Sequence, residues 1–137
     1  MKDNKKIESI LKLERMVFDK IEFTRMGFKN DQELELQIQS SILKRQDAKC
    51  YKVVLALSGE KPQEYTFNIN LSGYFSIETD DDLTDDLINT LISKNSVAIL
   101  MPYLRSQVSL LTAQPEVECV VLPAFNINNM LEKDERE

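Results

Sequence analysis

The sequence predicts an α+β domain in which a four-stranded antiparallel sheet carries two main helices packed on one face. Four segments between Leu11 and Ile77 alternate apolar and polar residues, a period typical of strands with one buried face. Short connections between neighbouring segments favour antiparallel pairing, because a parallel return needs a long crossover. Two apolar helical segments follow the strands, so we expect them to cover the apolar face of the sheet.

Each of the four segments places its large apolar side chains on one side and polar side chains on the other. The strands are expected at residues 11–23, 33–42, 50–58 and 64–77. The turn SGEKPQ, rich in breakers, closes a hairpin between the last two strands. The expected apolar side consists of Leu11, Leu13, Val17, Ile21 and Phe23, then Leu34, Leu36, Ile38 and Ile42, then Tyr51, Val53, Leu55 and Leu57, and finally Tyr65, Phe67, Ile69, Leu71, Phe75 and Ile77.

Two positions in these strands leave alternatives open. The first segment starts ambiguously, because residues 7–14 also fit a short helix. Gly73 lies on the apolar side of the fourth strand, where it marks either a bulge or a close approach by another element.

The first expected helix covers residues 79–95, TDDDLTDDLINTLISKN. Acidic residues in its first turn offset the positive end of the helix dipole, and Thr79 to Asp82 offer capping side chains. The second helix covers residues 96–111, with Pro102 near its start or at a kink, since proline costs least in the first turn. After the helices, residues 116–123 are expected to be extended, and NINNML to form one last turn.

At 137 residues, the chain is expected to form a single domain over residues 1–137, with 1–9 and 132–137 as frayed ends. Its composition, 42% hydrophobic and 29% charged, is typical of a globular chain. We find no export signal and no apolar run long enough to span a membrane, so we expect a cytoplasmic protein without membrane insertion. A net charge of −6 argues against nucleic acid as a partner, because phosphate binding needs a cationic surface.

Residue types that carry catalysis or metal binding are scarce in this sequence. The chain has no histidine, which excludes a Cys/His metal site and deprives a serine or cysteine nucleophile of its commonest activator. With three glycines it has no glycine-rich phosphate loop. We therefore expect no enzyme activity, no metal and no cofactor, and we interpret Cys50 and Cys119 as reduced, buried thiols.

Apolar residues outside the expected core are the candidates for partner binding. Met16, Phe18 and Val54 are expected on the outward, polar face of the sheet. Met26 and Phe28 lie in the connection TRMGFKNDQE after the first strand. Two alternatives stay open: the strand residues lie beneath a neighbouring subunit or are scattered surface residues, and the loop residues fold back onto the sheet edge.

Both expected helices have more apolar surface than one contact with the sheet requires. Self-association of helices from two copies would bury this surplus, and a groove for a client protein is the alternative. Met101 and Tyr103, at the start of the second helix, complete the candidate client-binding residues.

Four motifs of the chain resemble the SecB family of bacterial protein-export chaperones. They stand in the family's order between Arg15 and Leu131, so the resemblance covers nearly the whole chain. The third motif looks like the family pattern I-L-F-P-Y-A-R, and the fourth is similar to its P-V-N-F-D-A-L-F tail. The motifs are YKVVLALS (51–58), GYFSI (73–77), ILMPYLRSQVSLL (99–111) and LPAFNINNML (122–131).

The resemblance implies a homotetramer, a dimer of dimers with helices at the interface. It also implies an ATP-independent holdase for unfolded or aggregation-prone proteins, either in protein export or for a dedicated client. Methionine and phenylalanine suit this task, because adaptable apolar side chains bind unfolded chains with little sequence preference. The family has no catalytic residues and no cofactor.

The chain departs from the family at the outward sheet face. Positions that are acidic in members handing clients to the SecA motor correspond here to Lys20, Thr24 and Asn68, so we expect a negative docking patch to be largely missing. The family tryptophan has no counterpart, since the chain has no Trp. These departures favour a dedicated chaperone, such as that of an antitoxin in a toxin–antitoxin–chaperone system, over one that docks on SecA. A small-molecule-binding protein or enzyme of similar architecture is the outside alternative.

Overall fold

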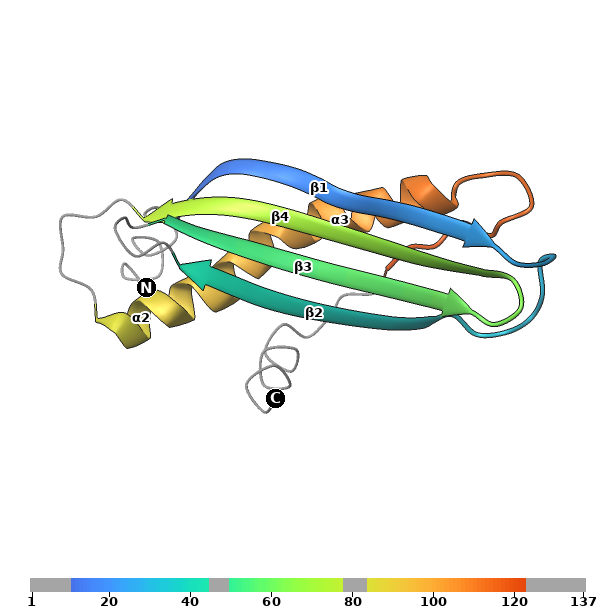
Figure 1. Ribbon diagram of the computed structural model, residues 1–137, viewed down its shortest axis with the longest axis horizontal. Helices are drawn as coiled ribbons and strands as arrows, with labels where there is room; N and C mark the ends of the chain where they lie inside the picture. Colours follow the sequence, from blue (N-terminus) through green and yellow to red (C-terminus); the bar gives the residue numbers. More distant parts are fainter. Residues whose placement is uncertain (1–10, 45–49, 78–83, 123–137) are drawn as a thin grey trace.

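A computed structural model describes residues 11–44, 50–77 and 84–122 (Figure 1). Four strands come first and one helical segment follows them. The expected sheet class is confirmed, and the expected hairpin turn lies between β3 and β4. The elements are β1 (Leu11–Arg25), β2 (Glu35–Lys44), β3 (Cys50–Lys61), β4 (Tyr65–Ile77), α2 (Asp85–Thr90), η1 (Leu91–Ser96) and α3 (Val97–Thr112).

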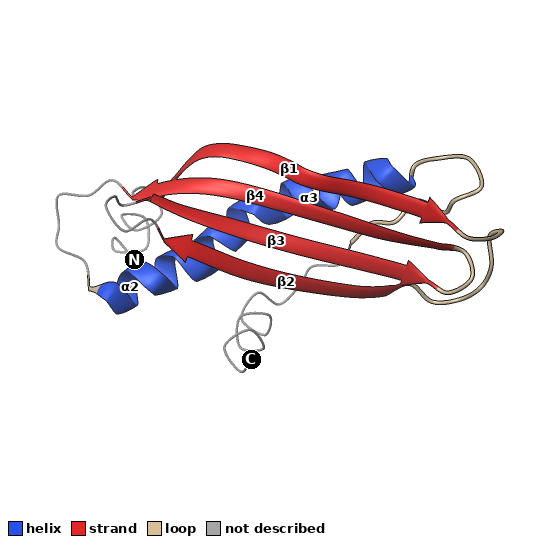
Figure 2. Cartoon of the chain, viewed as in Figure 1, coloured by secondary structure: helices blue, strands red, loops and turns tan. Residues whose placement is uncertain are grey.

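The strands form one open antiparallel sheet in the order β1-β4-β3-β2. β1 and β2 are neighbours in sequence but lie at opposite edges of the sheet. The helical segment runs obliquely across one face (Figure 2), and the other face has no such cover in the described part of the chain. The molecule is therefore a two-layer α+β structure, as the alternation of its strands predicts.

The first strand corrects our assignment of faces. Its pairing with β4 shifts register twice, so that Glu14 and Asp19 have no direct partner across the pair. Each of these carboxylates accepts a hydrogen bond from a β4 serine: Ser76 donates to Glu14 over 2.6 Å, and Ser72 donates to Asp19. Because each bulge adds one residue, the side chains between the bulges change face relative to a strict alternation.

Met16 and Phe18 therefore lie on the helix side and not on the outward face, as we had expected. Met16 stands opposite Gly73 and Phe18 opposite the buried Leu71, and both are partly buried against the core. Val17 takes the outward position instead and is 41% exposed. The expectation that these two large residues are left in water was wrong.

The two expected helices form one continuous segment, because α2, η1 and α3 follow one another without a break. The segment begins at Asp85, where the Thr84 side chain accepts a hydrogen bond from the Leu87 N–H over 3.2 Å and caps the first turn. The proposed caps at residues 79–82 lie outside the described residues. Pro102 lies inside α3 and not in a first turn. The π-helical turn η1 precedes α3, a feature that widens a helix locally.

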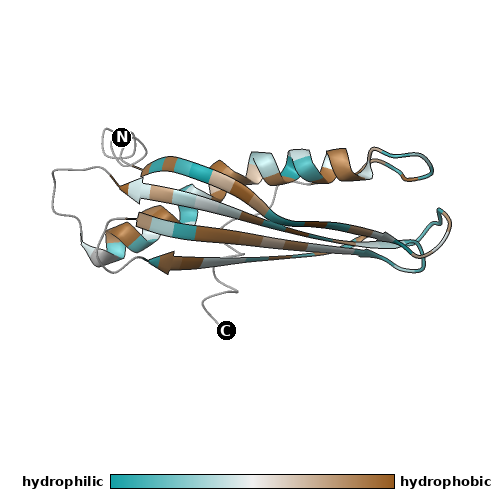
Figure 3. Ribbon diagram, turned by 45° about the horizontal axis from the view of Figure 1, so that its top comes forward, coloured by the Kyte–Doolittle hydropathy of each residue, from teal (hydrophilic) through white to brown (hydrophobic). Residues whose placement is uncertain are grey.

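The core lies between the helix and the central strands β3 and β4 (Figure 3). Gly73 marks the close approach that the sequence allows, because a Cβ there would lie 2.8 Å from Leu100 Cδ2 of α3. After α3 the chain bends and turns over residues 114–117, where an extended run was expected from residue 116; residues 118–122 form neither helix nor strand, and Val120 N–H donates to Thr112 Oγ1 over 2.8 Å. The NINNML turn falls outside the described part. Within that part, no helix combines the length and the apolar character that a membrane crossing requires.

Candidate polypeptide-binding site

The connection from β1 to β2 must cross the β3–β4 hairpin, because these strands lie at opposite sheet edges (Figure 1). We call residues 26–34 the crossover loop. It carries two exposed apolar side chains, Met26 at 53% and Phe28 at 89% exposure. Burial of such side chains would lower the free energy of a protein in water, so their exposure on an ordered loop needs a structural cause.

Backbone hydrogen bonds to the hairpin hold the start of the crossover loop. The Glu64 carbonyl oxygen accepts from the Met26 N–H over 2.7 Å and from the Gly27 N–H over 3.1 Å. Gly27 sits so close to the hairpin that a Cβ on it would lie 2.2 Å from the Gln63 carbonyl oxygen. Only glycine therefore fits at position 27 without displacing backbone.

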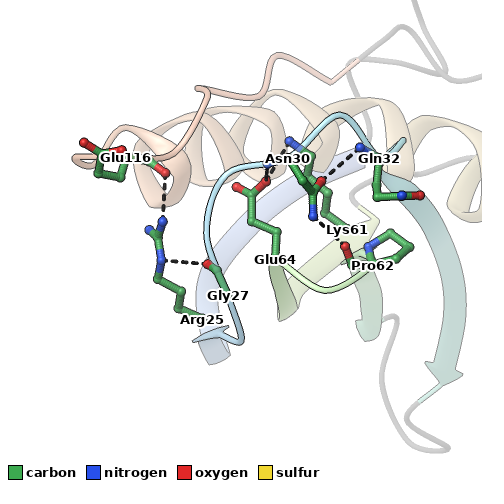
Figure 4. Close-up of polar contacts among 8 residues, drawn as sticks. All are labelled: Arg25, Gly27, Asn30, Gln32, Lys61, Pro62, Glu64 and Glu116. Carbon is green, nitrogen blue, oxygen red and sulfur yellow. Dashed lines mark hydrogen bonds and ion pairs between the residues drawn. The ribbon is translucent and has the colours of Figure 1, made fainter.

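Side chains of the hairpin hold the middle of the loop (Figure 4). The Glu64 carboxylate accepts from the Asn30 N–H over 2.9 Å and forms an ion pair of 2.9 Å with Lys61. The Asn30 side-chain amide donates to the Pro62 carbonyl oxygen over 2.9 Å and its oxygen accepts from the Gln32 N–H over 2.9 Å. Asn30 thus bridges the loop to the hairpin through its backbone N–H and its side-chain amide N–H, while its side-chain oxygen bonds within the loop.

Glu64 and Lys61 are a buried ion pair beneath the loop, with 0% and 8% of their side chains exposed. Burial alone raises the pKa of Glu64, but the bonds to Lys61 and Asn30 outweigh it, so the net pKa lies below the usual value. Glu64 is therefore ionised at neutral pH. Its Oε2 is buried without a hydrogen-bond partner among the described residues, while Oε1 takes the contacts.

Arg25 joins the loop to the chain that follows α3 (Figure 4). Its Nε donates to the Gly27 carbonyl oxygen over 3.0 Å, and its Nη2 donates to the Glu116 carbonyl oxygen over 3.2 Å. Beneath this region Phe23 stacks on Tyr65, with ring centroids 4.9 Å apart. The loop base is thus fixed to three separate parts of the fold.

The crossover loop leads into an apolar strip that we did not assign to binding from the sequence. The helix-facing side of β2, together with Leu34 at the end of the crossover loop, carries four aliphatic residues that are only partly covered, and β2 is an edge strand. Ile42 is 38% exposed. The strip, which we call the β2 strip, consists of Leu34, Leu36, Ile38 and Ile42. Its alternation was visible, but its poor cover depends on the oblique path of the helix.

The remaining expected client-binding residues lie elsewhere. Val54 is half-buried on the outward face, opposite Ser72. Met101 belongs to the core, with 7% exposure, whereas Tyr103 on α3 is 46% exposed. With Met16 and Phe18 packed against the core, the seven candidates do not form one surface. The structure singles out the two on the crossover loop.

Lys20, Thr24 and Asn68 all lie on the outward face, where we expected them. The same face also carries acidic residues, as the alternation of the strands predicts: Glu22 stands opposite Asn68 and forms a 3.7 Å ion pair with Lys20. A hollow of about 340 Å³ opens beside them. It is lined by Glu35, Gln37, Ser58, Gly59, Glu60, Thr66, Phe67 and Asn68.

A third region of partly exposed apolar surface lies on α3. An open hollow of about 650 Å³ runs between α3 and residues 119–122. Leu110 on one side is 70% exposed and Val121 on the other is 74% exposed. The surplus apolar surface expected on the helix is therefore present, and it lies apart from the sheet.

Groups for metal chemistry are sparse among the residues that the structure describes. No cluster there brings together three or more His, Cys, Asp or Glu side chains suited to hold a metal ion. Cys119 is exposed and Cys50 half-buried, which corrects our expectation of two buried thiols.

No family model and no curated protein sequence matches the chain. Its structure is similar to that of the Mycobacterium tuberculosis Rv1957 SecB-like chaperone in complex with a ChAD peptide from the Rv1956 HigA1 antitoxin. The TM-score is 0.66 at 15% identity, over 92% of this chain and 98% of that one. A Streptococcus agalactiae protein of unknown function matches with a TM-score of 0.45 at 13% identity, over 83% of this chain and 97% of that one. The first likeness shows a SecB-like fold.

Proposed function

We propose that this protein is an ATP-independent SecB-like chaperone, a holdase that binds unfolded polypeptide through the crossover loop and the β2 strip. The observation that carries the proposal is Phe28, 89% exposed on a loop whose backbone is bonded to the hairpin. A free loop would fold this ring onto the core. A loop fixed by Glu64 keeps the Phe28 ring in contact with water. Binding of the ring to another apolar surface would then lower the free energy.

The chemistry of this surface suits unfolded chains. Met26 and Phe28 offer a flexible and an aromatic side chain, and the β2 strip adds aliphatic side chains along an edge strand. Such surfaces tolerate many sequences, because apolar contacts are not directional. No step of this proposed binding needs a nucleotide or a catalytic group.

The fold supports two kinds of client. A SecB-like protein of similar fold binds a peptide from an antitoxin, which favours a dedicated client of that kind. The alternative is general protein export with SecA as partner. A pull-down from the host lysate separates them: one dominant small partner supports the dedicated role, whereas many secretory precursors together with SecA support export.

We further propose a homotetramer in which α3 packs against α3 of another copy. Leu110 and Val121 flank a hollow large enough to accept side chains from a second helix. Leu110→Asp should lower the molar mass measured by light scattering, because it places a charge in that contact. An unchanged mass would contradict this assembly.

The holdase proposal is tested by suppression of aggregation of a chemically unfolded protein. Phe28→Asp should abolish suppression while the fold and the molar mass stay unchanged, since Phe28 has almost no contact to lose. Val17→Asp is the matched control, because it adds the same charge to an exposed apolar residue on the other face. Equal activity of Phe28→Asp and the wild-type protein would refute the assignment of the crossover loop.

A further inference from the structure

The outward sheet face carries a cation–aromatic row at the end away from the crossover loop. Arg15, Tyr74, Lys52 and Leu43 are direct cross-strand neighbours on β1, β4, β3 and β2. We call them the Tyr74 row. The Arg15 guanidinium carbon lies 4.7 Å and the Lys52 Nζ 5.7 Å from the centroid of the Tyr74 ring. Both cations therefore converge on one aromatic platform.

Among the residues that the structure describes, no carboxylate forms an ion pair with Arg15 or Lys52, although the chain has a net charge of −6. The ion pairs within the described part of the chain are Lys12–Glu14, Lys20–Glu22 and Lys61–Glu64. None of them includes Arg15 or Lys52. An aromatic ring attracts a cation but leaves its N–H groups free to donate to an anion.

A hollow of about 510 Å³ opens along the Tyr74 row. Beside the row it is lined by Glu14, Lys44, Cys50, Tyr51 and Phe75. Among its described lining residues Glu14 is the one acidic side chain, and that carboxylate already accepts from Ser76 and lies 3.9 Å from Lys12. The hollow thus joins free cations to an aromatic and aliphatic wall, in which Leu43 is 59% exposed.

We propose that the Tyr74 row is a docking site for an acidic peptide segment of a partner protein. Carboxylates of that segment would contact Arg15 and Lys52, and a neighbouring apolar side chain would enter the hollow. Arginine suits this role because its planar guanidinium donates two parallel bonds to a carboxylate. The site is separate from the proposed client surface: the row and the crossover loop lie at opposite ends of the sheet (Figure 1), and the row faces outward whereas the β2 strip faces the helix. The protein could therefore hold a client and a partner together.

A second copy of the chain is the competing occupant. Glu22, Glu35 and Glu60 lie on the same outward face toward the other end, so two copies packed head to tail would also pair opposite charges. Polar side chains fill most of the face between the two ends, however, including Asn70, Ser72 and Gln39. This composition does not suit a stable interface, because such interfaces are more apolar at their centre.

The test is fluorescence anisotropy with a labelled synthetic peptide of glutamates around one phenylalanine. Wild-type protein should bind it, and binding should weaken from about 0.01 M to about 0.15 M salt as the screening length falls from ~30 to ~8 Å. Lys52→Glu should weaken binding about tenfold, since it replaces an attraction by a repulsion. Arg15→Lys should weaken binding less than Lys52→Glu does, because it keeps the positive charge but loses the two parallel bonds of the guanidinium. Lys20→Glu is the matched control, because it makes the same charge change on the same face and should alter binding less than about twofold.

Several outcomes would overturn the proposal. The first is that Lys52→Glu binds the glutamate peptide as tightly as the wild type. The second is that Lys20→Glu loses as much affinity as Lys52→Glu. The third is that the wild type binds a peptide with lysines in place of the glutamates equally well. A fall in molar mass of Lys52→Glu without peptide binding by the wild type would assign the row to a second copy. Thermal unfolding of each variant separates these results from a failure to fold.

Discussion

The buried ion pair under the crossover loop gives the sharpest prediction about stability. Replacing Glu64 by Gln keeps an oxygen for the Asn30 N–H but leaves the Lys61 ammonium, 8% exposed, without its counter-charge. Breaking a fully buried pair costs about 3–5 kcal/mol. The pair is covered on one side by a single loop, so we expect a smaller cost than for a fully buried pair, a loss of about 2–3 kcal/mol in the free energy of unfolding.

Urea denaturation measures this loss as a shift of the midpoint at constant slope. Glu60→Gln is the matched control, because Glu60 is exposed on the same hairpin and should change stability by less than about 0.5 kcal/mol. Combining Glu64→Gln with Lys61→Met should recover most of the loss, since the unpaired charge is removed as well. A Glu64→Gln protein as stable as the wild type would refute the stabilising role of the pair.

Three further predictions concern pH, the loop and the strand faces. The pKa of Glu64 in the folded protein lies below its usual value of 4.5. The ionised carboxylate therefore stabilises the fold above pH 4.5, and this stabilisation is lost as the pH falls through the folded pKa. Glu64→Gln should flatten this part of the stability–pH curve. Gly27→Ala should displace the crossover loop. Limited proteolysis should then cleave the loop faster, and the protein should suppress aggregation less. Phe18→Asp should cost about 3 kcal/mol and Val17→Asp less than about 1, because only Phe18 packs on the core; equal losses in urea would contradict the bulged register.

Much of the sheet could be predicted from the period of its residues. In β2, β3 and β4 the residues expected on the apolar side recur at every second position, interrupted only by Ser40 and Gly73, and they lie on the helix side. In β1 the run Met16-Val17-Phe18 breaks the alternation, and a run of three large apolar residues in an edge strand is itself a signal of a bulge. No sequence rule locates the two extra residues, because their positions depend on Ser72 and Ser76 of a distant strand.

The candidate site was predictable only in part. Met26 and Phe28 stand out as large apolar residues in a polar connection. Glu64 and Lys61 look like ordinary charges of a hairpin turn, because the loop that buries them is distant in sequence. The two expected helices merge because the expected boundary at residues 95 and 96 lies inside the π-helical turn η1, through which the backbone continues from α2 into α3.

The opposite placement of β1 and β2 has a consequence for synthesis on the ribosome. Of the four strands β1 emerges first, yet its partner is β4, so Leu11 cannot pair until Ile77 has been synthesised. The sheet therefore cannot close from its N-terminus as it is made, and such non-local pairing slows folding. During that delay β1 is an unpaired strand, but the charges at Glu14 and Asp19 make it a poor template for aggregation. The seating of the crossover loop on the finished β3–β4 hairpin is then among the last events, and its amide protons should be the latest to gain protection from exchange.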